Sequence, residues 1–314
     1  MGASASASCS AHIRVALVTD VAGLRSRADA GAWKGVTEAA AEIPCLKPEL
    51  ITPGRPSEYR RRLQDAVDDR HNLVIGASFL LTDATVETAR ANPGTRFALI
   101  DPLLPAPPLP NLDVVVFRRD QAAFLAGTLA ALVTRTGVIA GVYGPGGSLD
   151  VENRQAFERG ARNVRPAIQV LGAYQPASEG TPYGNPAWGN AQARAFVDRS
   201  ADVIFGAGGS TGEGAAQTAA QTGRWCLGVD FDAETYPPAA PCLLASTATF
   251  FDRGVELEVL RVAGGGASGE LSVGLTERAV GLNLSGSTEL TPAVRQRLAM
   301  IQDALVSGRL TTSP

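Results

Sequence analysis

The stretch that decides the fold is residues 202–222, DVIFGAGGSTGEGAAQTAAQT. It begins with Asp202–Phe205, a short apolar run with the length of a strand and without alternating polar residues. Glycines follow, and then a helix-like segment, Glu213–Thr222. A strand without a polar face is covered on both sides, as in a parallel sheet. The stretch therefore predicts one βα unit of an α/β protein.

Similar units recur along the chain, because short apolar runs such as Val114–Val116 alternate with helix-like segments. A natural break falls at the proline-rich stretch Pro102–Pro110, with five predicted strands near or before it and five after it. We therefore expect two doubly wound domains of similar architecture. In the C-terminal part we expect a helix over Phe250–Ala263, a strand pair near Leu271–Leu284 and a last helix over Pro292–Ser307. This part is too small for a third domain, so it is expected to cross back between the two.

Length, charge and composition narrow the class of protein. The 314 residues suffice for about two domains. The net charge of −3 offers no basic surface for nucleic acid, so no nucleic-acid partner is expected. No apolar run approaches the roughly 20 residues that span a bilayer. With His12 and His71 as the two histidines, we expect no metal site, no cofactor and little scope for acid–base catalysis.

The N-terminal stretch MGASASASCSAH is small and polar and has no apolar core. It predicts no signal peptide within this chain, and residues 1–11 are expected to form a flexible tail. A leader removed before residue 1 remains compatible with this pattern.

The four cysteines stand close to the starts of predicted strands. Cys9 and Cys45 precede the first two, and Cys226 and Cys242 open two later ones. Consecutive parallel strands begin at the same edge, so each pair comes within disulfide reach if its strands are neighbours. We predict the disulfides Cys9–Cys45 and Cys226–Cys242 in an oxidising compartment. Four buried thiols are the alternative, and metal ligation is disfavoured because no CxxC spacing occurs.

The glycine-rich turn after Phe205 resembles two known motifs. Gly208–Gly212 has the GxSxG spacing of a hydrolase nucleophile elbow, but no histidine follows His71 to act as the base. Together with Asp230 it also mimics a dinucleotide fingerprint, although it lies in the third βα unit of its half rather than the first. We prefer a third interpretation, in which the backbone at Gly208 approaches a ligand. The alternative is a tight strand–helix turn.

Aspartates follow several predicted strands at their carboxyl ends, where ligands of open α/β sheets bind. They are Asp20, Asp101 and Asp230. Carboxylates there suit hydroxyl, amine or ring N–H donors, whereas each aspartate alone would also serve as a helix cap or turn residue. Trp188 is predicted in a polar loop before a helix, either as a stacking platform or as a lid that packs on the helix.

The chain resembles the basic membrane protein family of solute-binding proteins, which includes purine-nucleoside receptor lipoproteins. The resemblance extends from residue 14 to about 305. Its segments are Val18–Gly23, Ala32–Gly35, Pro93–Asp101, Phe124–Gly127, Phe157–Ala161, Ala201–Phe205, Gly208–Gly212 and Gly228–Asp230.

The resemblance implies a type I periplasmic-binding-protein fold: two Rossmann-like lobes joined by a three-crossover hinge. The N-terminal lobe would comprise 12–117 plus 247–270, and the C-terminal lobe 118–246 plus 271–314. It further implies an extracytoplasmic, non-enzymatic solute-binding protein that acts as a monomer. Such a protein would hold a nucleoside or related heterocycle between its lobes and deliver it to an ABC transporter permease. A lipid anchor is left open.

The family's nucleoside-contacting aspartates match Asp20, Asp101 and Asp230. Its stacking aromatic before the sixth helix is matched to Trp188, and its following acidic position to Asn190. By this resemblance, these residues are candidate ligand contacts, together with Gly208.

This chain also departs from the family pattern. Where the family has Ser-Phe-Asn after the first strand, this chain has Arg27-Ala28-Asp29, so Asp29 joins the candidates and one stacking ring is lost. Phe79 is a candidate replacement for that ring, and the family's lysine aligns with Thr249. Two other classes of function stay open: a ligand-sensing regulatory or chemoreceptor-coupled protein of the same fold, and an enzyme on a doubly wound fold.

Overall fold

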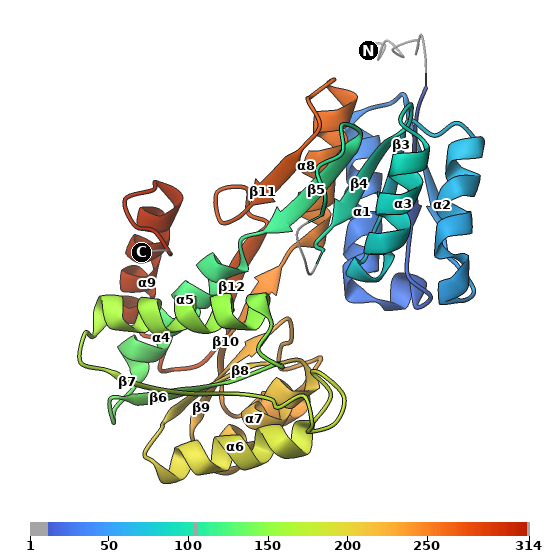
Figure 1. The fold of residues 1–314 in the computed structure, drawn as a ribbon. Coiled ribbons are helices and arrows are strands. Elements are labelled where there is room, and N and C mark those ends of the chain that lie inside the picture. Colours follow the sequence, from blue (N-terminus) through green and yellow to red (C-terminus); the bar gives the residue numbers. More distant parts are fainter. Residues whose placement is uncertain (1–11, 103–105, 313–314) are drawn as a thin grey trace. The chain divides into compact units, whose positions relative to one another are not determined.

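The computed structural model describes residues 12–102 and 106–312, so the predicted flexible tail lies outside the described residues. Two α/β units make up these ranges (Figure 1). Unit 1 runs to Phe117 and takes in Phe250–Val273 and Glu277–Ala279. Unit 2 comprises Arg118–Thr249, Gly274–Thr276 and the described residues from Val280 onward. The expectation of two doubly wound units is confirmed.

Unit 1 is built on one sheet, with strand order β11-β5-β4-β3-β1-β2 and parallel pairing throughout. Its strands are β1 (Ile13–Val18), β2 (Leu46–Ile51), β3 (Leu73–Gly76), β4 (Arg96–Ile100), β5 (Leu112–Phe117) and β11 (Glu270–Val273). Its α-helices are α1 (Arg27–Glu42), α2 (Tyr59–Asp68), α3 (Thr82–Ala91) and α8 (Phe251–Ala263). Short 3-10 turns, Gly23–Arg25, Pro56–Glu58 and Phe79–Leu81, precede α1, α2 and α3.

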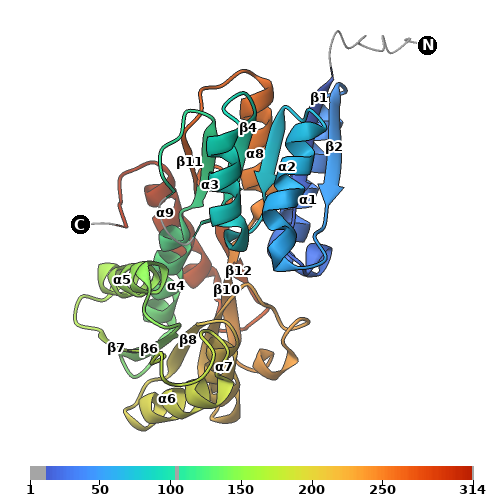
Figure 2. The same cartoon turned by 45° about the vertical axis from the view of Figure 1, so that its right-hand side comes forward.

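Helices cover both faces of this sheet, as Figures 1 and 2 show. α1 packs against α8, and α2 packs against α3. Along β1, Ala16 and Val18 belong to the core that includes Leu63 of α2, whereas Leu17 is equally buried and points to the opposite face. Burial on both faces explains why the strands are apolar without alternation.

Two expectations about the chain's organisation are wrong. The proline-rich stretch is not a boundary, because it connects β4 to β5 within the sheet of unit 1. It marks a connection between neighbouring strands, and unit 2 begins only after Phe117. The predicted strand pair near the C-terminus also does not form, because β11 pairs with β5 and the later strand joins the other sheet.

Unit 2 repeats the architecture with strand order β12-β10-β9-β8-β6-β7, in which only β12 runs antiparallel to its neighbour among the described strands. Its strands are β6 (Val138–Tyr143), β7 (Gln169–Tyr174), β8 (Val203–Ala207), β9 (Trp225–Val229), β10 (Leu243–Thr249) and β12 (Val280–Leu284). Its α-helices are α4 (Arg119–Val133), α5 (Ser148–Val164), α6 (Pro186–Asp198), α7 (Ser210–Gln221) and α9 (Pro292–Val306). A 3-10 turn, Pro237–Ala239, lies between β9 and β10.

A pair of glycines lets α4 and α5 approach closely. A Cβ atom on Gly127 would lie 1.9 Å from the carbonyl oxygen of Phe157, and one on Gly160 would lie 1.9 Å from that of Phe124. No side chain fits at either position, so the two backbones meet directly. This contact packs α4 closely against α5.

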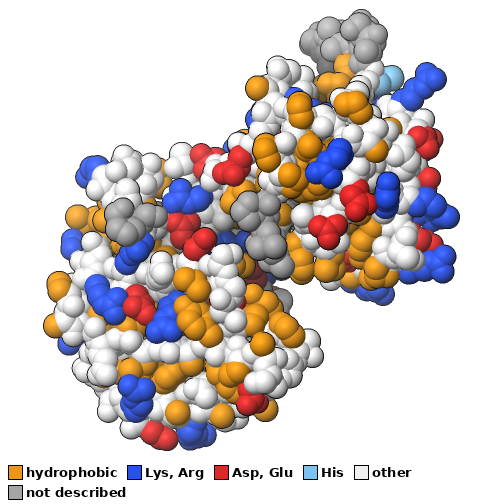
Figure 3. All heavy atoms as spheres, viewed as in Figure 1, with side chains coloured by type: hydrophobic (Ala, Val, Ile, Leu, Met, Phe, Trp, Pro, Cys, Tyr) orange, Lys and Arg blue, Asp and Glu red, His pale blue; other side chains and the backbone are white. Residues whose placement is uncertain are grey.

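Charged side chains of both signs are interspersed on the face of each unit seen in Figure 3. This agrees with the near-neutral composition and gives no basic surface on that face. Among the described residues, no helix combines the length and apolar character that crossing a membrane would require.

Candidate functional site

The parallel strands of each sheet end at one edge, and the candidate residues gather at these two carboxyl edges. Asp101 follows β4 and Asp230 follows β9, which occupy equivalent places in the two sheet orders. The N–H of Asp101 donates to Val115 on the next strand at 2.9 Å, and that of Asp230 donates to Thr247 at 2.8 Å. Both aspartates have φ of 57°, in the left-handed region that L-residues seldom occupy. Such backbone strain clusters at functional sites.

In unit 1, two buried carboxyl groups lie at the end of β1. The Asp20 N–H donates to Oδ2 of Asp29 at 3.0 Å, and Asp29 in the first turn of α1 is 0% exposed. Ser26 caps this helix by accepting from the Asp29 N–H. The pKa of Asp29 is raised to about 7, mainly by burial and also by the neighbouring charge of Asp20, against the lowering effect of the backbone hydrogen bond.

The neighbouring loop of unit 1 carries Phe79, which lies in a 3-10 turn after β3 and is 45% exposed. Leu80 beside it is 52% exposed, and Val21 and Leu24 in the loop after β1 are also exposed. β1 and β3 are paired strands, so these apolar side chains flank the aspartates at the same edge of the sheet. Phe79 is therefore accessible for ligand contact, as the prediction requires.

In unit 2, the turn after β8 is built from glycines that have no room for a side chain. A Cβ on Gly208 would lie 2.9 Å from the backbone nitrogen of Gly144, which follows β6. Gly209 has φ of 56° and is the N-cap residue of α7, which starts at the next residue. The tight-turn interpretation therefore accounts for the local need for glycine. The exposed Gly209 and Ser210 still leave the start of α7 open to solvent.

Tyr183 is an aromatic side chain at this edge that the sequence interpretation missed. Its hydroxyl donates to Oδ2 of Asp150 at 3.0 Å, and its ring lies on Gly144, where an added Cβ would be 2.1 Å from the ring. Its carbonyl accepts the N–H of Thr211 in the first turn of α7. Burial, then the charge of Asp150, raises the pKa of Tyr183 to about 12. The ring is thus held in place and half-exposed, as a stacking surface would be.

Trp188 and Asn190 occupy different positions from those expected. Trp188 lies in the first turn of α6, so the prediction that it lies in a loop is wrong. Its side chain packs against the core of unit 2, which includes Ala193 and Phe196. Asn190 accepts a hydrogen bond from Thr218 of α7 at 2.7 Å, which joins the two helices. Because α6 begins at Pro186, the aromatic residue that precedes it is Tyr183.

The carboxylate of Asp230 takes part in a short chain of hydrogen bonds. The Thr249 N–H donates to Oδ1 of Asp230 at 3.0 Å. Nε of Arg119 in turn donates to the Thr249 hydroxyl at 3.1 Å. A guanidinium group therefore lies beside the position to which the family lysine was aligned.

The cysteines bear on the stability of unit 2. Cys226 and Cys242, which are both buried, form a disulfide that joins β9 to the residue before β10. Cys45 is also disulfide-bonded, whereas Cys9 lies outside the described residues, so the Cys9–Cys45 pair stays a prediction.

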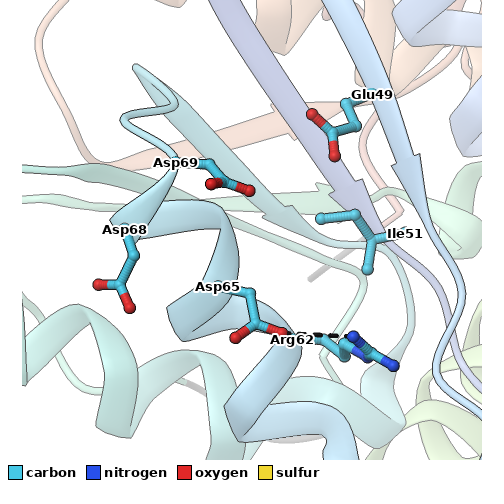
Figure 4. Close-up of a pocket in the computed structure, with 6 residues that line it drawn as sticks. All are labelled: Glu49, Ile51, Arg62, Asp65, Asp68 and Asp69. Carbon is cyan, nitrogen blue, oxygen red and sulfur yellow. Dashed lines mark hydrogen bonds and ion pairs between the residues drawn. The ribbon is translucent and has the colours of Figure 1, made fainter.

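A separate pocket of about 350 Å³ lies between β2 and α2 in unit 1 (Figure 4). Its lining residues are Glu49, Ile51, Arg62, Asp65, Asp68 and Asp69. Arg62 forms an ion pair with Asp65 at 3.4 Å along the exposed side of α2. Across the part of the chain that the structure describes, no cluster of histidine, cysteine and carboxylate side chains could hold a metal ion.

The fold is that of a type I periplasmic-binding protein, as predicted. A solute-binding protein of an ABC transporter from Aeropyrum pernix K1 has a TM-score of 0.69 and 18% identity, and the match covers 95% of this chain and 92% of that one. A transcriptional activator of the comK gene from Bacillus halodurans has a TM-score of 0.76 and 16% identity, over 95% and 99% of the two chains. These likenesses concern the fold alone.

Residues 26–310 match the family described as ABC transporter substrate-binding protein, PnrA-like. The chain belongs to this family, and the predicted resemblance to basic membrane proteins is confirmed. The nucleoside-binding protein BmpA of Lactococcus lactis, described as part of an ABC transporter, is 26% identical over 234 residues. That match covers 71% of this chain and 65% of the relative, so the chain spans just under two thirds of the relative's length.

Proposed function

We propose that this chain is an extracytoplasmic solute-binding protein of an ABC importer, and that its ligand is a nucleoside or a closely related heterocycle. The family and the name of the Lactococcus lactis relative support this proposal. The observation that carries it is the arrangement at the carboxyl edge of unit 2. There the ring of Tyr183, in the connection between β7 and α6, lies against Gly144 at the end of β6, and Asp230 follows β9. Both β6 and β9 pair with β8.

Each group has a role that suits a nucleoside. The Tyr183 ring stacks on the base, a contact worth about 1–3 kcal/mol. Asp230 and Asp101 accept hydrogen bonds from hydroxyl or ring N–H groups, and a charged acceptor makes such bonds stronger. At the carboxyl edge of unit 1, Asp20 and Phe79 are further candidate contacts. No residue is assigned a catalytic role, and the ligand is released unchanged to the permease.

Native mass spectrometry tests this function. The protein is incubated with an equimolar mixture of nucleosides, free bases and ribose, and the mass that it retains is measured. We expect a nucleoside to be retained by the wild-type protein and lost from the Asp230→Asn variant. Retention of ribose alone, or of none of the components, would contradict the proposal.

A regulatory binding protein of the same fold is the second candidate, favoured by the structural likeness to a transcriptional activator. A transport assay distinguishes the two candidate functions. A permease partner reconstituted in vesicles should import nucleoside only when this protein is present. A regulatory protein would bind the same ligand and leave uptake unchanged.

A further inference from the structure

Two carboxyl groups at the end of β1 share one buried environment. Asp29 is 0% exposed and Asp20 is 9% exposed. Oδ2 of Asp29 accepts the Asp20 N–H at 3.0 Å, and Oδ1 of Asp20 accepts the Ala22 N–H at 2.6 Å. Oδ1 of Asp29 is buried and has no hydrogen-bond partner among the described residues. An ionised carboxylate with an unsatisfied buried oxygen is costly, so this geometry favours a proton on the pair.

The charged groups around the pair do not offset its charge. The charge of Asp20 acts on Asp29 from the end of β1. Burial raises the pKa of the Tyr59 hydroxyl on α2, and the charges of both aspartates raise it as well. The exposed Arg25 in the preceding turn donates through Nε to the Ala22 carbonyl. On α8, which packs against α1, Asp252 forms an ion pair with Lys34.

We propose that Asp20 and Asp29 form a one-proton carboxyl pair, and that a ligand donating a hydrogen bond to Asp20 expels this proton to solvent. The inference rests on the proposed function, because it takes Asp20 as a ligand contact. The exchange is balanced: the Asp29 carboxyl becomes a carboxylate, its proton passes to buffer, and the ligand's donor group takes over the stabilisation of the pair. No covalent bond of the ligand changes.

The direction in which ligand affinity changes with pH follows from the burial of Asp29. Asp29 is already fully enclosed, so a bound ligand adds little desolvation, which would otherwise favour the protonated form. A donor on Asp20 lowers the negative potential felt by Asp29 and thereby lowers its pKa. Affinity therefore rises between about pH 6 and pH 8, by up to tenfold for each unit by which the ligand lowers the pKa of Asp29. A ligand that presented an acceptor to the pair would show the opposite trend.

Calorimetric titration of a nucleoside in buffers with different ionisation enthalpies tests the proton release. For the wild-type protein at about pH 6, we expect the observed heat to depend on the buffer and the affinity to rise toward pH 8. The Asp29→Asn variant keeps the side-chain shape and should show neither effect. The matched control is Asp83→Asn, which changes an exposed aspartate in the first turn of α3 and should behave as the wild type. A pH profile shared by wild type and Asp29→Asn would overturn the proposal.

A measurement on the free protein separates this inference from the proposed function. Infrared difference spectra between wild type and Asp29→Asn at about pH 6 should contain the C=O band of a protonated carboxyl group. If the band is present and no nucleoside binds, the one-proton pair is supported and the proposed ligand is wrong. If the band is absent, the pair is ionised and this inference is overturned whatever the ligand.

Discussion

Asp101 and Asp230 have the same left-handed backbone, with φ of 57°, at equivalent points in the two sheets. Each continues the hydrogen-bond ladder to the next strand through its N–H before the chain turns away. Aspartate tolerates this conformation better than most residues, although glycine would adopt it at lower cost. A carboxylate kept at both strained positions indicates that the side chain has a use. In the proposed function, that use is ligand recognition.

The Asp230→Asn change tests this assignment, because asparagine also tolerates positive φ and has nearly the same shape. Loss of a hydrogen bond to a charged group costs about 1.5–3 kcal/mol, so ligand affinity should fall roughly ten- to a hundredfold. The midpoint of thermal unfolding should change little. Calorimetry and circular dichroism measure the two effects, and unchanged affinity would show that Asp230 does not contact the ligand.

The aromatic contact can be assigned by comparing two substitutions. Tyr183→Ala removes the half-exposed ring at the carboxyl edge and should weaken binding about tenfold or more. Trp188→Phe alters a ring packed against the core and should lower the unfolding temperature with little effect on binding. The reverse result, with binding lost only in the Trp188 variant, would restore the original match of the stacking residue to Trp188.

The sequence predicts some of these features and not others. It predicts the α/β architecture, because buried parallel strands require apolar runs, as in β8. The start of α6 also has a sequence signal, since Asn185 caps the helix and Pro186 occupies its first turn. These two residues predict a helix that includes Trp188. The Asp20–Asp29 pair could not be predicted, because its properties depend on burial and on a hydrogen bond between separate elements.

The close approach of α4 and α5 predicts a strong effect of Gly127→Ala. The added Cβ would lie 1.9 Å from the Phe157 carbonyl oxygen, so the two helices must separate. We expect a loss of about 1–3 kcal/mol or more in the free energy of unfolding, measured by denaturant titration. Gly94→Ala is the control, because no atom lies within 4 Å of its added Cβ. Its effect should stay within about 0.5 kcal/mol.

The disulfide between Cys226 and Cys242 should stabilise unit 2 without affecting ligand binding. It closes a sequence separation of 16 residues, for which about 3 kcal/mol is expected. The double replacement of both cysteines by alanine should therefore lower the unfolding temperature. Affinity should be retained, because the bond lies toward the start of β9 and Asp230 follows its end. A variant that lost binding while remaining folded would contradict this separation.

Glu258 should make the stability of unit 1 depend on pH. Its pKa is raised from 4.5 to about 7, mainly by burial and also by the charge of Asp113, against the lowering effect of Arg261. The folded state therefore holds the proton more tightly than the unfolded state. The stabilising contribution is complete below about pH 4.5 and is lost as pH rises through about 7. In the Glu258→Gln variant, the unfolding midpoint should depend less on pH across this window. An unchanged pH dependence would show that another group is responsible.

The most direct test of the central claim is calorimetric titration of the wild-type protein with a nucleoside, and separately with its free base and with ribose. We predict saturable binding of the nucleoside and much weaker binding of either part, because the proposed function assigns the ring of Tyr183 and the carboxylate of Asp230 to different parts of one ligand. No binding of any nucleoside, or equal binding of ribose alone, would contradict the account.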